Sequence, residues 1–573
     1  MSKKIISRRR FLIDSVFTSG GILMAANYIS CNDNNQITEV SKNFSINNFL
    51  HGVASFDPTS NQVIIWTRYA TTQAEVSITW QVAYNADFKT IIRSGEVVTD
   101  KSRDYTVAIE LQNLEPNKKL YYRFLNNIDK SMSVTGETIT LPTNAEAIKL
   151  AVCSCSNFQA GLFNVYDAMA KSEADIVVHL GDYIYEYAAN EYGTNKFTNS
   201  LNRKHIPEKE ITTLIDYRDR YKQYRTDKHL QLLHQKKPFI CVWDDHEIAN
   251  DTFKEGAENH QTNEGLFETR KANAIKAYSE YLPVRTADKN LIYRNFNIGN
   301  LINLIMLDTR VIGRDKQLEY GTYINSKGEF DQTKFLQEWL NPNRTMLGNT
   351  QKNWLLSQVA SSNAKWQVLG QQVLMGKMMI PAELLFSLGA IERGGTNALE
   401  QFKNTMTELV KIKVRVISQD PTLSDSDIAR LNTVLPYNLD AWDGYPVERE
   451  MLYASFAKAG KKMICLAGDT HNAWYNDLID NSTNNIGKEF ATSSVTSPGL
   501  EYYLGIEDAT NTATFEYAME LLISDLNYLN ASERGYLLMN FSANEINSKW
   551  IFVNTIHNQI YSETIDKEDT YSA

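Results

Sequence analysis

Four mainly apolar runs, each followed directly by acidic or other polar residues, constrain the fold of this chain more than any other sequence feature. The runs cover residues 176–180, 239–243, 304–307 and 463–467. Continuous apolar runs of this length are typical of strands buried on both faces of a sheet, and helical-looking segments separate them. The pattern predicts an α/β domain in which the polar residues at the strand ends gather along one rim of the sheet.

Residues 45–143 have a different pattern, in which apolar and polar residues alternate. Val76, Ile78, Trp80, Val82 and Tyr84 repeat with a period of two, as expected of half-buried strands. Short strands at this spacing predict a small all-β sandwich of the immunoglobulin or fibronectin kind. Since no cluster of chemically active residues lies within it, we expect a packing or binding module.

The α/β domain is predicted to span residues 148–545 and to precede a C-terminal tail at 546–573. Between about 377 and 445 it contains a charged, helical-looking insertion with an amphipathic run through Phe402, Met406 and Leu409. The insertion is either a cap or lid beside the site or a surface elaboration without function, and the sequence leaves both open. A length of 573 residues agrees with two or more domains.

Composition and charge exclude some classes of partner. With 43% hydrophobic and 22% charged residues, the chain has the composition of a globular protein. Its formal net charge of −10 gives no global basic footprint for nucleic acid, and we predict no specific nucleic-acid partner. An anionic substrate would need a local positive charge or a bound metal to offset this charge at the site.

Residues 1–31 are predicted to be an export signal. Arg8-Arg9-Arg10 precede an apolar stretch that is too short to span a membrane. An arginine pair within this run resembles a twin-arginine signal. The export machinery of that pathway is therefore a predicted partner, and the periplasm or cell surface is the predicted location. Cys31 resembles the acylated cysteine of a lipoprotein, although Tyr28 departs from that pattern. A lipid anchor on Cys31 and ordinary cleavage nearby both remain open.

The polar residues at the predicted strand ends combine carboxylates with histidines. They are Asp182, Asp244, Asp245, His246, Asp469 and His471, with Tyr185 three residues after Asp182. Mutual repulsion would make such a cluster costly unless a cation lay among the carboxylates. Oxygen and imidazole ligands suit Fe(III), Mn, Ca or Zn, and a pair of metals can activate water and bind a phosphoryl group. The sequence therefore predicts a metal site.

These clusters lie within longer motifs that match a known family in their order. The motifs are Gly-Asp-Tyr-Ile-Tyr-Glu at 181–186, Trp-Asp-Asp-His-Glu-Ile-Ala-Asn at 243–250 and Gly-Asp-Thr-His-Asn at 468–472, with further blocks at 153–156, 307–310 and 494–499. Over roughly residues 45–540 the chain resembles the PhoD-like alkaline phosphatases. Because that family belongs to the metallophosphoesterases, the resemblance implies an α/β fold, a four-layer αββα sandwich preceded by the small all-β domain.

The resemblance also implies ligands for Fe(III) and for one or two Ca(II) ions. The implied ligands on the iron side are Cys155 as a thiolate, Asp182 bridging the metals, Tyr185 as a phenolate, and His471; those on the calcium side are Asp245, Asn250 and Asp469. Thiolate and phenolate stabilise Fe(III), whereas calcium prefers carboxylate and amide oxygens. Cys153 is the alternative to Cys155, and the alternative role of Tyr185 is a packed aromatic residue.

His246 and Arg310 are the predicted catalytic residues, because we expect both to contact the phosphate. A planar guanidinium matches two phosphate oxygens. Asp244 either touches a metal or orients a neighbour, and Asp308 either joins the site or anchors the loop that presents Arg310.

The resulting hypothesis is an exported alkaline phosphatase in which metal-bound hydroxide attacks the phosphorus in line, without a side-chain nucleophile. Phosphate monoesters, with diesters as further substrates, fit a role in phosphate scavenging. The first alternative is a phosphodiesterase or phospholipase D-type enzyme that acts on lipid or polymer diesters. A non-catalytic surface binding protein is the second alternative, and the intact motif set argues against it.

Overall fold

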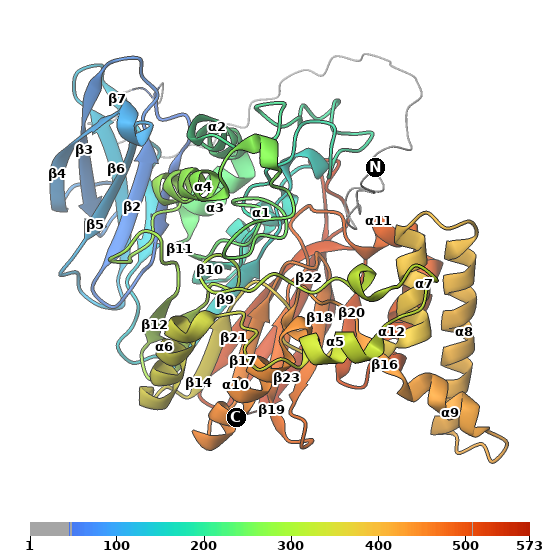
Figure 1. The fold of residues 1–573 in the computed structure, drawn as a ribbon. Coiled ribbons are helices and arrows are strands. Elements are labelled where there is room, and N and C mark those ends of the chain that lie inside the picture. The colour runs from blue at the N-terminus through green and yellow to red at the C-terminus, as the bar shows by residue number, and fades with distance from the viewer. Residues whose placement is uncertain (1–44, 46–47, 507, 573) are drawn as a thin grey trace.

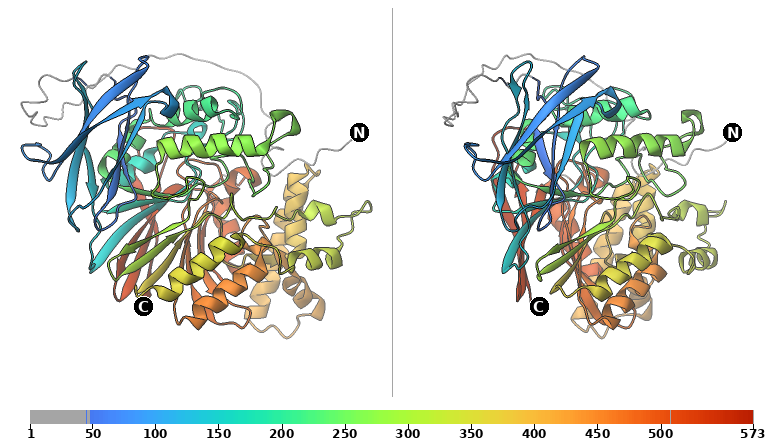
Figure 2. Two further views of the ribbon diagram at one scale, coloured as in Figure 1. Left: turned by 60° about the vertical axis from the view of Figure 1, so that its left-hand side comes forward. Right: turned by 90° about the vertical axis from the view of Figure 1, so that its left-hand side faces the viewer.

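The computed structural model describes residues 45, 48–506 and 508–572 (Figure 1). The predicted export signal, with Cys31, lies outside the described residues. The main body consists of two β-sheets packed face to face, with helices on the outside, as the two turned views in Figure 2 show. A smaller all-β unit lies at one end.

The first sheet has nine strands. In spatial order they are β23 (Glu563–Ser572), β22 (Glu545–Val553), β21 (Arg534–Ser542), β9 (Ala147–Cys153), β10 (Ile176–His179), β11 (Phe239–Cys241), β1 (Val53–Phe56), β2 (Val63–Arg68) and β5 (Thr106–Leu111). The central strands β9, β10 and β11 are parallel. Their carboxyl ends, which carry several predicted site residues, therefore lie on one rim of the sheet.

Residues 546–573 are not the C-terminal tail that the sequence suggested. Their described part belongs to β22 and β23, and β22 pairs antiparallel with both β21 and β23. Ile546, Trp550 and Phe552 alternate with less buried positions and pack into the core. The segment looks polar in the sequence because β23 forms the edge of the sheet and exposes most of its charged side chains.

The second sheet has seven strands. In spatial order they are β12 (Arg294–Ile298), β13 (Ile302–Met306), β14 (Trp366–Gly370), β17 (Met463–Ala467), β19 (Asn485–Ala491), β18 (Ala473–Ile479) and β20 (Leu526–Asn530). Strands β13, β14, β17 and β19 are parallel. Along β13, Leu304 packs into the core between the sheets and Ile305 into the core beneath the outer helices, as the period of a strand requires.

Helices cover the outer faces of both sheets (Figure 1). Helices α1 (Asn164–Lys171) and α3 (Lys228–Lys236) pack on the first sheet, and α6 (Gly348–Ser361) and α10 (Pro446–Lys458) lie on the second. The arrangement is the four-layer αββα sandwich that the resemblance implied. The remaining helices of this domain are α2 (Leu214–Tyr224), α4 (Phe267–Tyr281), α5 (Gln332–Trp339), α11 (Leu500–Leu504) and α12 (Ala509–Leu522).

The N-terminal all-β unit is a sandwich that shares one of its sheets with the main body. Its own sheet consists of β4 (Ile91–Asp100), β3 (Glu75–Ala83), β6 (Lys119–Asn126), β7 (Ser131–Met132) and β8 (Gly136–Ile139). Val76, Ile78 and Val82 of β3 pack against residues of β2 and β5, which belong to the nine-stranded sheet. Because β1 also pairs with β11, the two units are joined by a continuous sheet.

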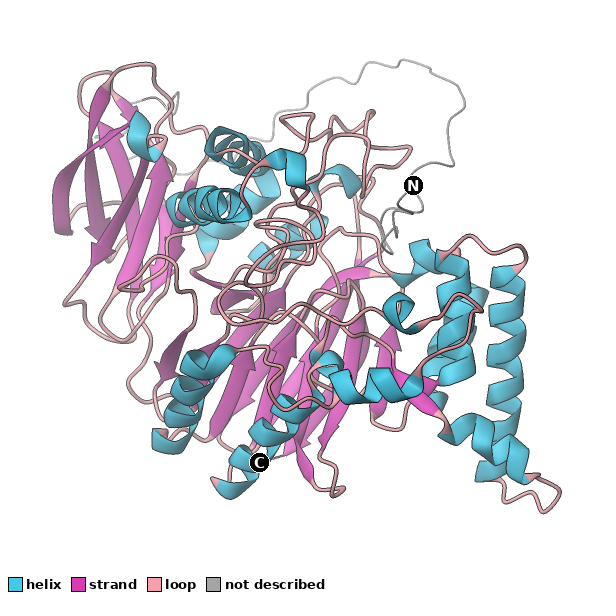
Figure 3. Ribbon diagram, in the orientation of Figure 1, coloured by secondary structure: helices cyan, strands magenta, loops and turns pink. Residues whose placement is uncertain are grey.

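The segment from 377 to 445 is helical and closes on itself. Its first and last strands, β15 (Met379–Pro381) and β16 (Val434–Pro436), pair antiparallel at its base. Between them lie α7 (Ala382–Glu392), α8 (Ala398–Ile417) and α9 (Asp425–Asn432), which gather on one side of the molecule (Figure 3). None of the described helices is both long and apolar enough to cross a membrane.

Candidate metal centre

The predicted site residues meet where the parallel strands of both sheets end. Cys155 follows β9, Asp182 follows β10, and Asp244, Asp245 and His246 follow β11. Arg310 follows β13 of the second sheet, and Asp469 and His471 follow β17. An isolated bridge between Ser154 and Ser494 joins the two rims at this point. All these site residues are buried. The fold brings together side chains that are more than 300 positions apart in the sequence.

Three overlapping groups of side chains have the composition of metal sites. Within each group the candidate ligand atoms lie within 4.8 Å of one another. The groups are Cys155 with Asp182 and His471; Asp182 with Asp245 and His246; and Asp244 with Asp245 and Asp469. Asp182 and Asp245 each belong to two groups, which therefore form one continuous cluster, called the carboxylate cluster below.

The backbone at this rim is strained. Four of the predicted ligands have positive φ angles, namely Cys155 at 64°, Asp182 at 56°, Asp469 at 62° and His471 at 66°. Each such residue costs on the order of 1–3 kcal/mol, and strain of this kind concentrates at functional sites. Gly181 is required here, because it has a φ of 108° and a Cβ atom would lie 2.4 Å from Cβ of Asp244.

The charge balance of the carboxylate cluster calls for a cation. Asp182 Oδ1 and Asp244 Oδ2 are buried and have no hydrogen-bond partner among the described residues. Burial, together with repulsion from neighbouring carboxylates, raises the pKa of Asp244 well above its usual range. Burial and then the charge of Asp182 raise the pKa of the Cys155 thiol in the same way. Metal ions would reverse both effects, so the donor set fits bound metal.

Tyr185 and His471 face the Cys155 side of the cluster. The Tyr185 hydroxyl donates to Asp182 Oδ2 at 2.9 Å and lies 3.2 Å from His471 Nε2. His471 Nδ1 lies 2.7 Å from the Pro498 carbonyl oxygen. Because a carbonyl oxygen can only accept, Nδ1 carries the proton in this contact and Nε2 is left to act as the ligand atom.

His246 belongs to the carboxylate cluster as well as to the predicted phosphate contacts. Its Nδ1 atom lies 2.6 Å from Glu186 Oε2. The other oxygen of Glu186 accepts the backbone N–H of Asn250 at 2.8 Å. Burial opposes the charge on Glu186, but His246 and the hydrogen bonds outweigh it and lower the pKa of this carboxyl. The ionised Glu186 thus orients His246 and the segment that carries Asn250.

Arg310 is fully buried and makes ion pairs with three carboxylates. Its Nε atom donates to Asp244, Nη1 to Asp440 at 2.9 Å, and Nη2 to Asp469 at 2.7 Å. Asp440 lies in the segment that returns from the helical insertion, and it also accepts from Arg314. The insertion therefore supplies a side chain that reaches the carboxylate cluster through Arg310.

Sequence reasoning did not assign several residues that the structure places at the site. Glu247 accepts the backbone N–H groups of Asp182 and Asp244, and so links two of the strand ends. Asp244, left open above, lies within the third candidate metal group. Glu186 and Glu247 stand inside the quoted motifs, which was an available signal, whereas Asp440 stands in no motif. Asp308 accepts the backbone N–H of Arg310 at 2.9 Å and so anchors that loop.

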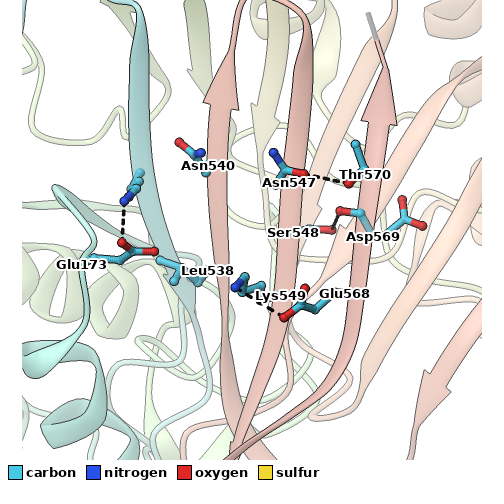
Figure 4. Close-up of a pocket in the computed structure, with 10 residues that line it drawn as sticks. Glu173, Leu538, Asn540, Asn547, Ser548, Lys549, Glu568, Asp569 and Thr570 are labelled. Carbon is cyan, nitrogen blue, oxygen red and sulfur yellow. Dashed lines mark hydrogen bonds and ion pairs between the residues drawn. The ribbon is translucent and has the colours of Figure 1, made fainter.

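An open pocket of about 490 Å³ lies elsewhere, over strands β9, β21, β22 and β23 (Figure 4). It is lined mainly by polar side chains of these strands, and no residue of the carboxylate cluster lines it. Its two lysines are paired with carboxylates, Lys149 with Glu173 and Lys549 with Glu568, and Asp569 adds one further negative charge. The carboxylate cluster is therefore the candidate functional site.

Comparisons with known proteins agree with this geometry. The profile of the family described as "PhoD-like phosphatase" matches residues 150–550, and that of its N-terminal domain matches residues 34–142. "Alkaline phosphatase D" of Bacillus subtilis (strain 168) is 34% identical over 483 residues, which cover 80% of this chain and 71% of the relative. A solved structure titled "Structure of PhoD" superposes with a TM-score of 0.71 at 28% identity, covering 92% of this chain and 91% of that one.

Proposed function

This chain belongs to the PhoD-like phosphatase family, and we propose that it is an exported alkaline phosphatase that hydrolyses phosphate monoesters at the carboxylate cluster. The observation that carries the proposal is the excess of buried carboxylates over the single guanidinium of Arg310. Such an arrangement is costly unless cations occupy it. A phosphatase needs the same cations, because its substrate is an anion.

Fe(III) and one or two Ca(II) ions are the metals we propose. Cys155, Tyr185 and His471 supply soft and electron-rich donors on the iron side, and Asp182 lies between them and the other carboxylates. Asp245, Asn250 and Asp469 supply the oxygen atoms that calcium prefers. The third group adds Asp244 to the proposed oxygen ligands. When bound, the metals would activate a water and offset the charge of the phosphoryl group.

The chain's own residues have separate tasks in this proposal. Glu186 holds His246 through its Nδ1 atom, which leaves Nε2 to contact a metal or phosphate. Arg310 would provide a planar donor for phosphate oxygens, and metals held by Asp244 and Asp469 would weaken the hold of these carboxylates on its guanidinium. Asp440 would keep the guanidinium in place with metals bound, because it lies outside the candidate metal groups. In-line attack by water then needs no side-chain nucleophile.

The experiment compares hydrolysis of a nitrophenyl phosphate monoester with that of the matching diester by the full chain, with iron and calcium supplied. We expect faster cleavage of the monoester and loss of both activities in Asp182→Asn. Asp477→Asn on β18, whose carboxylate pairs with Lys488 away from the cluster, is the control for the substitution itself and should retain activity. Undiminished turnover by Asp182→Asn would refute the proposed site. Faster diester cleavage would replace the monoesterase proposal by a phosphodiesterase or phospholipase, and an inactive, metal-free protein would leave only a binding role.

Export is a further part of the proposal and rests on the N-terminal sequence. Arg8-Arg9 would direct the chain through the twin-arginine pathway, which carries folded proteins, and phosphate scavenging outside the cytoplasm would be its role. Replacing both arginines by lysine should keep the protein inside the cell. For the proposed lipid anchor, Cys31→Ala should move the exported protein from the membrane fraction to the soluble fraction, and an unchanged distribution would refute lipidation.

A further inference from the structure

Ser497 connects two of the proposed iron ligands through one hydroxyl group. It lies in the loop after β19 and is fully buried. Its Oγ atom lies 2.6 Å from the hydroxyl oxygen of Tyr185 and 2.8 Å from the backbone carbonyl oxygen of Cys155. Both contacts have hydrogen-bonding length, but a serine hydroxyl carries one proton and can donate to only one acceptor at a time.

The charge of the Tyr185 oxygen decides which acceptor receives the proton. While Tyr185 is a neutral phenol, its own proton goes to Asp182 Oδ2 and the two acceptors of Ser497 compete as neutral groups. A phenolate oxygen is the stronger acceptor, because hydrogen bonds to ionised groups are roughly twice as strong. The Cys155 carbonyl can release the serine proton, since the backbone N–H groups of Thr496 and Ser497 also point at it, each at 3.3 Å.

We propose that Ser497 is a positioning residue whose hydroxyl donates to the Tyr185 phenolate when the metal site is filled. This inference rests on the proposed function, in which Tyr185 binds Fe(III). The hydrogen bond orients the tyrosine ring and withdraws electron density from its oxygen. It therefore limits how strongly the phenolate donates to iron, which is the way neighbouring groups tune a metal through its ligands.

The inference predicts a spectroscopic change that a purely structural serine would not cause. Fe(III) bound to phenolate gives a visible charge-transfer band, whose energy rises as the phenolate becomes less electron-rich. Ser497→Ala removes the donor, so the band should move to longer wavelength and the Fe(III)/Fe(II) reduction potential should become more negative. Ser497→Thr keeps the hydroxyl, so its band should stay close to that of the wild type.

A neighbouring residue supplies the matched control. Thr496 lies in the same loop, but its hydroxyl donates to the Asn157 carbonyl at 2.8 Å instead of to a proposed ligand. Thr496→Val should disturb the packing of the loop to a similar extent and leave the band unmoved. An equal shift in Thr496→Val and Ser497→Ala would overturn the inference, because it would assign the effect to the loop.

A second measurement needs no variant and so does not depend on the folding of Ser497→Ala. Resonance Raman spectra of the iron-loaded full chain, excited within the band, are compared in H₂O and D₂O. A shift of the phenolate C–O or Fe–O stretching frequencies is expected, because exchange replaces the proton that Ser497 donates. Stretching frequencies that do not shift in D₂O would refute the role of Ser497 and leave the iron–tyrosine bond standing. A visible band at the same wavelength in Ser497→Ala and wild type would have the same meaning. An iron-loaded wild type without the band would refute the proposed iron–tyrosine bond as well.

Discussion

Replacing Arg310 by methionine should tighten metal binding and weaken phosphate binding at the same time. In the structure the guanidinium neutralises Asp244 and Asp469, which are proposed metal ligands. A metal bound to these carboxylates competes with the guanidinium, whose Nε and Nη2 atoms contact one oxygen of Asp244 and one of Asp469. Hydrogen bonds to charged groups contribute about 1.5–3 kcal/mol each, and 1.4 kcal/mol corresponds to about tenfold in affinity. Loss of even one competing contact should therefore tighten calcium binding about tenfold.

The affinity for inorganic phosphate should fall in the same variant. In the filled site Arg310 is the proposed donor to phosphate oxygens, so its removal should raise the inhibition constant of inorganic phosphate by about tenfold or more, by the same hydrogen-bond energy. The two constants are measured by calorimetric titration with calcium and by inhibition of monoester hydrolysis. Arg310→Lys keeps the charge without the planar fork and should give intermediate values for both.

The control for this prediction is Arg449→Met. Arg449 is an equally buried arginine that pairs with Asp443 at 2.6 Å, away from the carboxylate cluster. Its replacement should destabilise the fold by about 3–5 kcal/mol, the usual effect of breaking a buried ion pair, and leave calcium affinity unchanged. Weaker calcium binding by Arg310→Met would refute the reasoning, because it would show that the guanidinium holds the ligands in place instead of competing with the metal.

Three further predictions test neighbouring parts of the account. Asp440→Asn should raise KM for the monoester about tenfold with a smaller change in kcat, because it weakens one charged contact of Arg310; an unchanged KM would contradict this role. Gly181→Ala should abolish metal binding, measured by metal analysis, because its Cβ atom would collide with Asp244; a full metal content would contradict the tight contact. Burial raises the pKa of Glu516 from 4.5 to about 7, so stability should be lost as pH rises through that range. The thermal midpoint of Glu516→Gln should fall less over the same range, and parallel curves would show that Glu516 does not contribute.

The sequence was sufficient to predict that the side chains after several buried strands meet at one rim, as those of the three candidate metal groups do. Asp182 and Asp469 each follow a short buried strand, and parallel strands place such residues on one rim whatever the details of the loops. The position of Asp440 could not be predicted in this way. It is 130 positions from Arg310 in the sequence, and the insertion that carries it has no motif and no fixed place relative to a strand.

The sheet boundaries were harder to predict for a related reason. β1 joins β11 through a pairing between Phe56 and Phe239, and β22 joins the first sheet through β21. Long-range pairings of this kind depend on which sheet edges are available in the folded protein. The local alternation of apolar and polar residues predicts a strand but not its neighbour in the sheet. The alternation in residues 45–143 thus predicted strands correctly without showing that three of them extend the sheet of the α/β domain.

The central claim is that the carboxylate cluster is a metal site on which phosphate ester hydrolysis depends. It is tested most directly by measuring metal content and the monoester hydrolysis rate on one preparation of the full chain, before chelation, after chelation, and after iron and calcium are returned. The account predicts that iron and calcium are present, that the rate falls as they are removed, and that it recovers when they are restored. A metal-depleted protein that keeps its full rate would contradict the account.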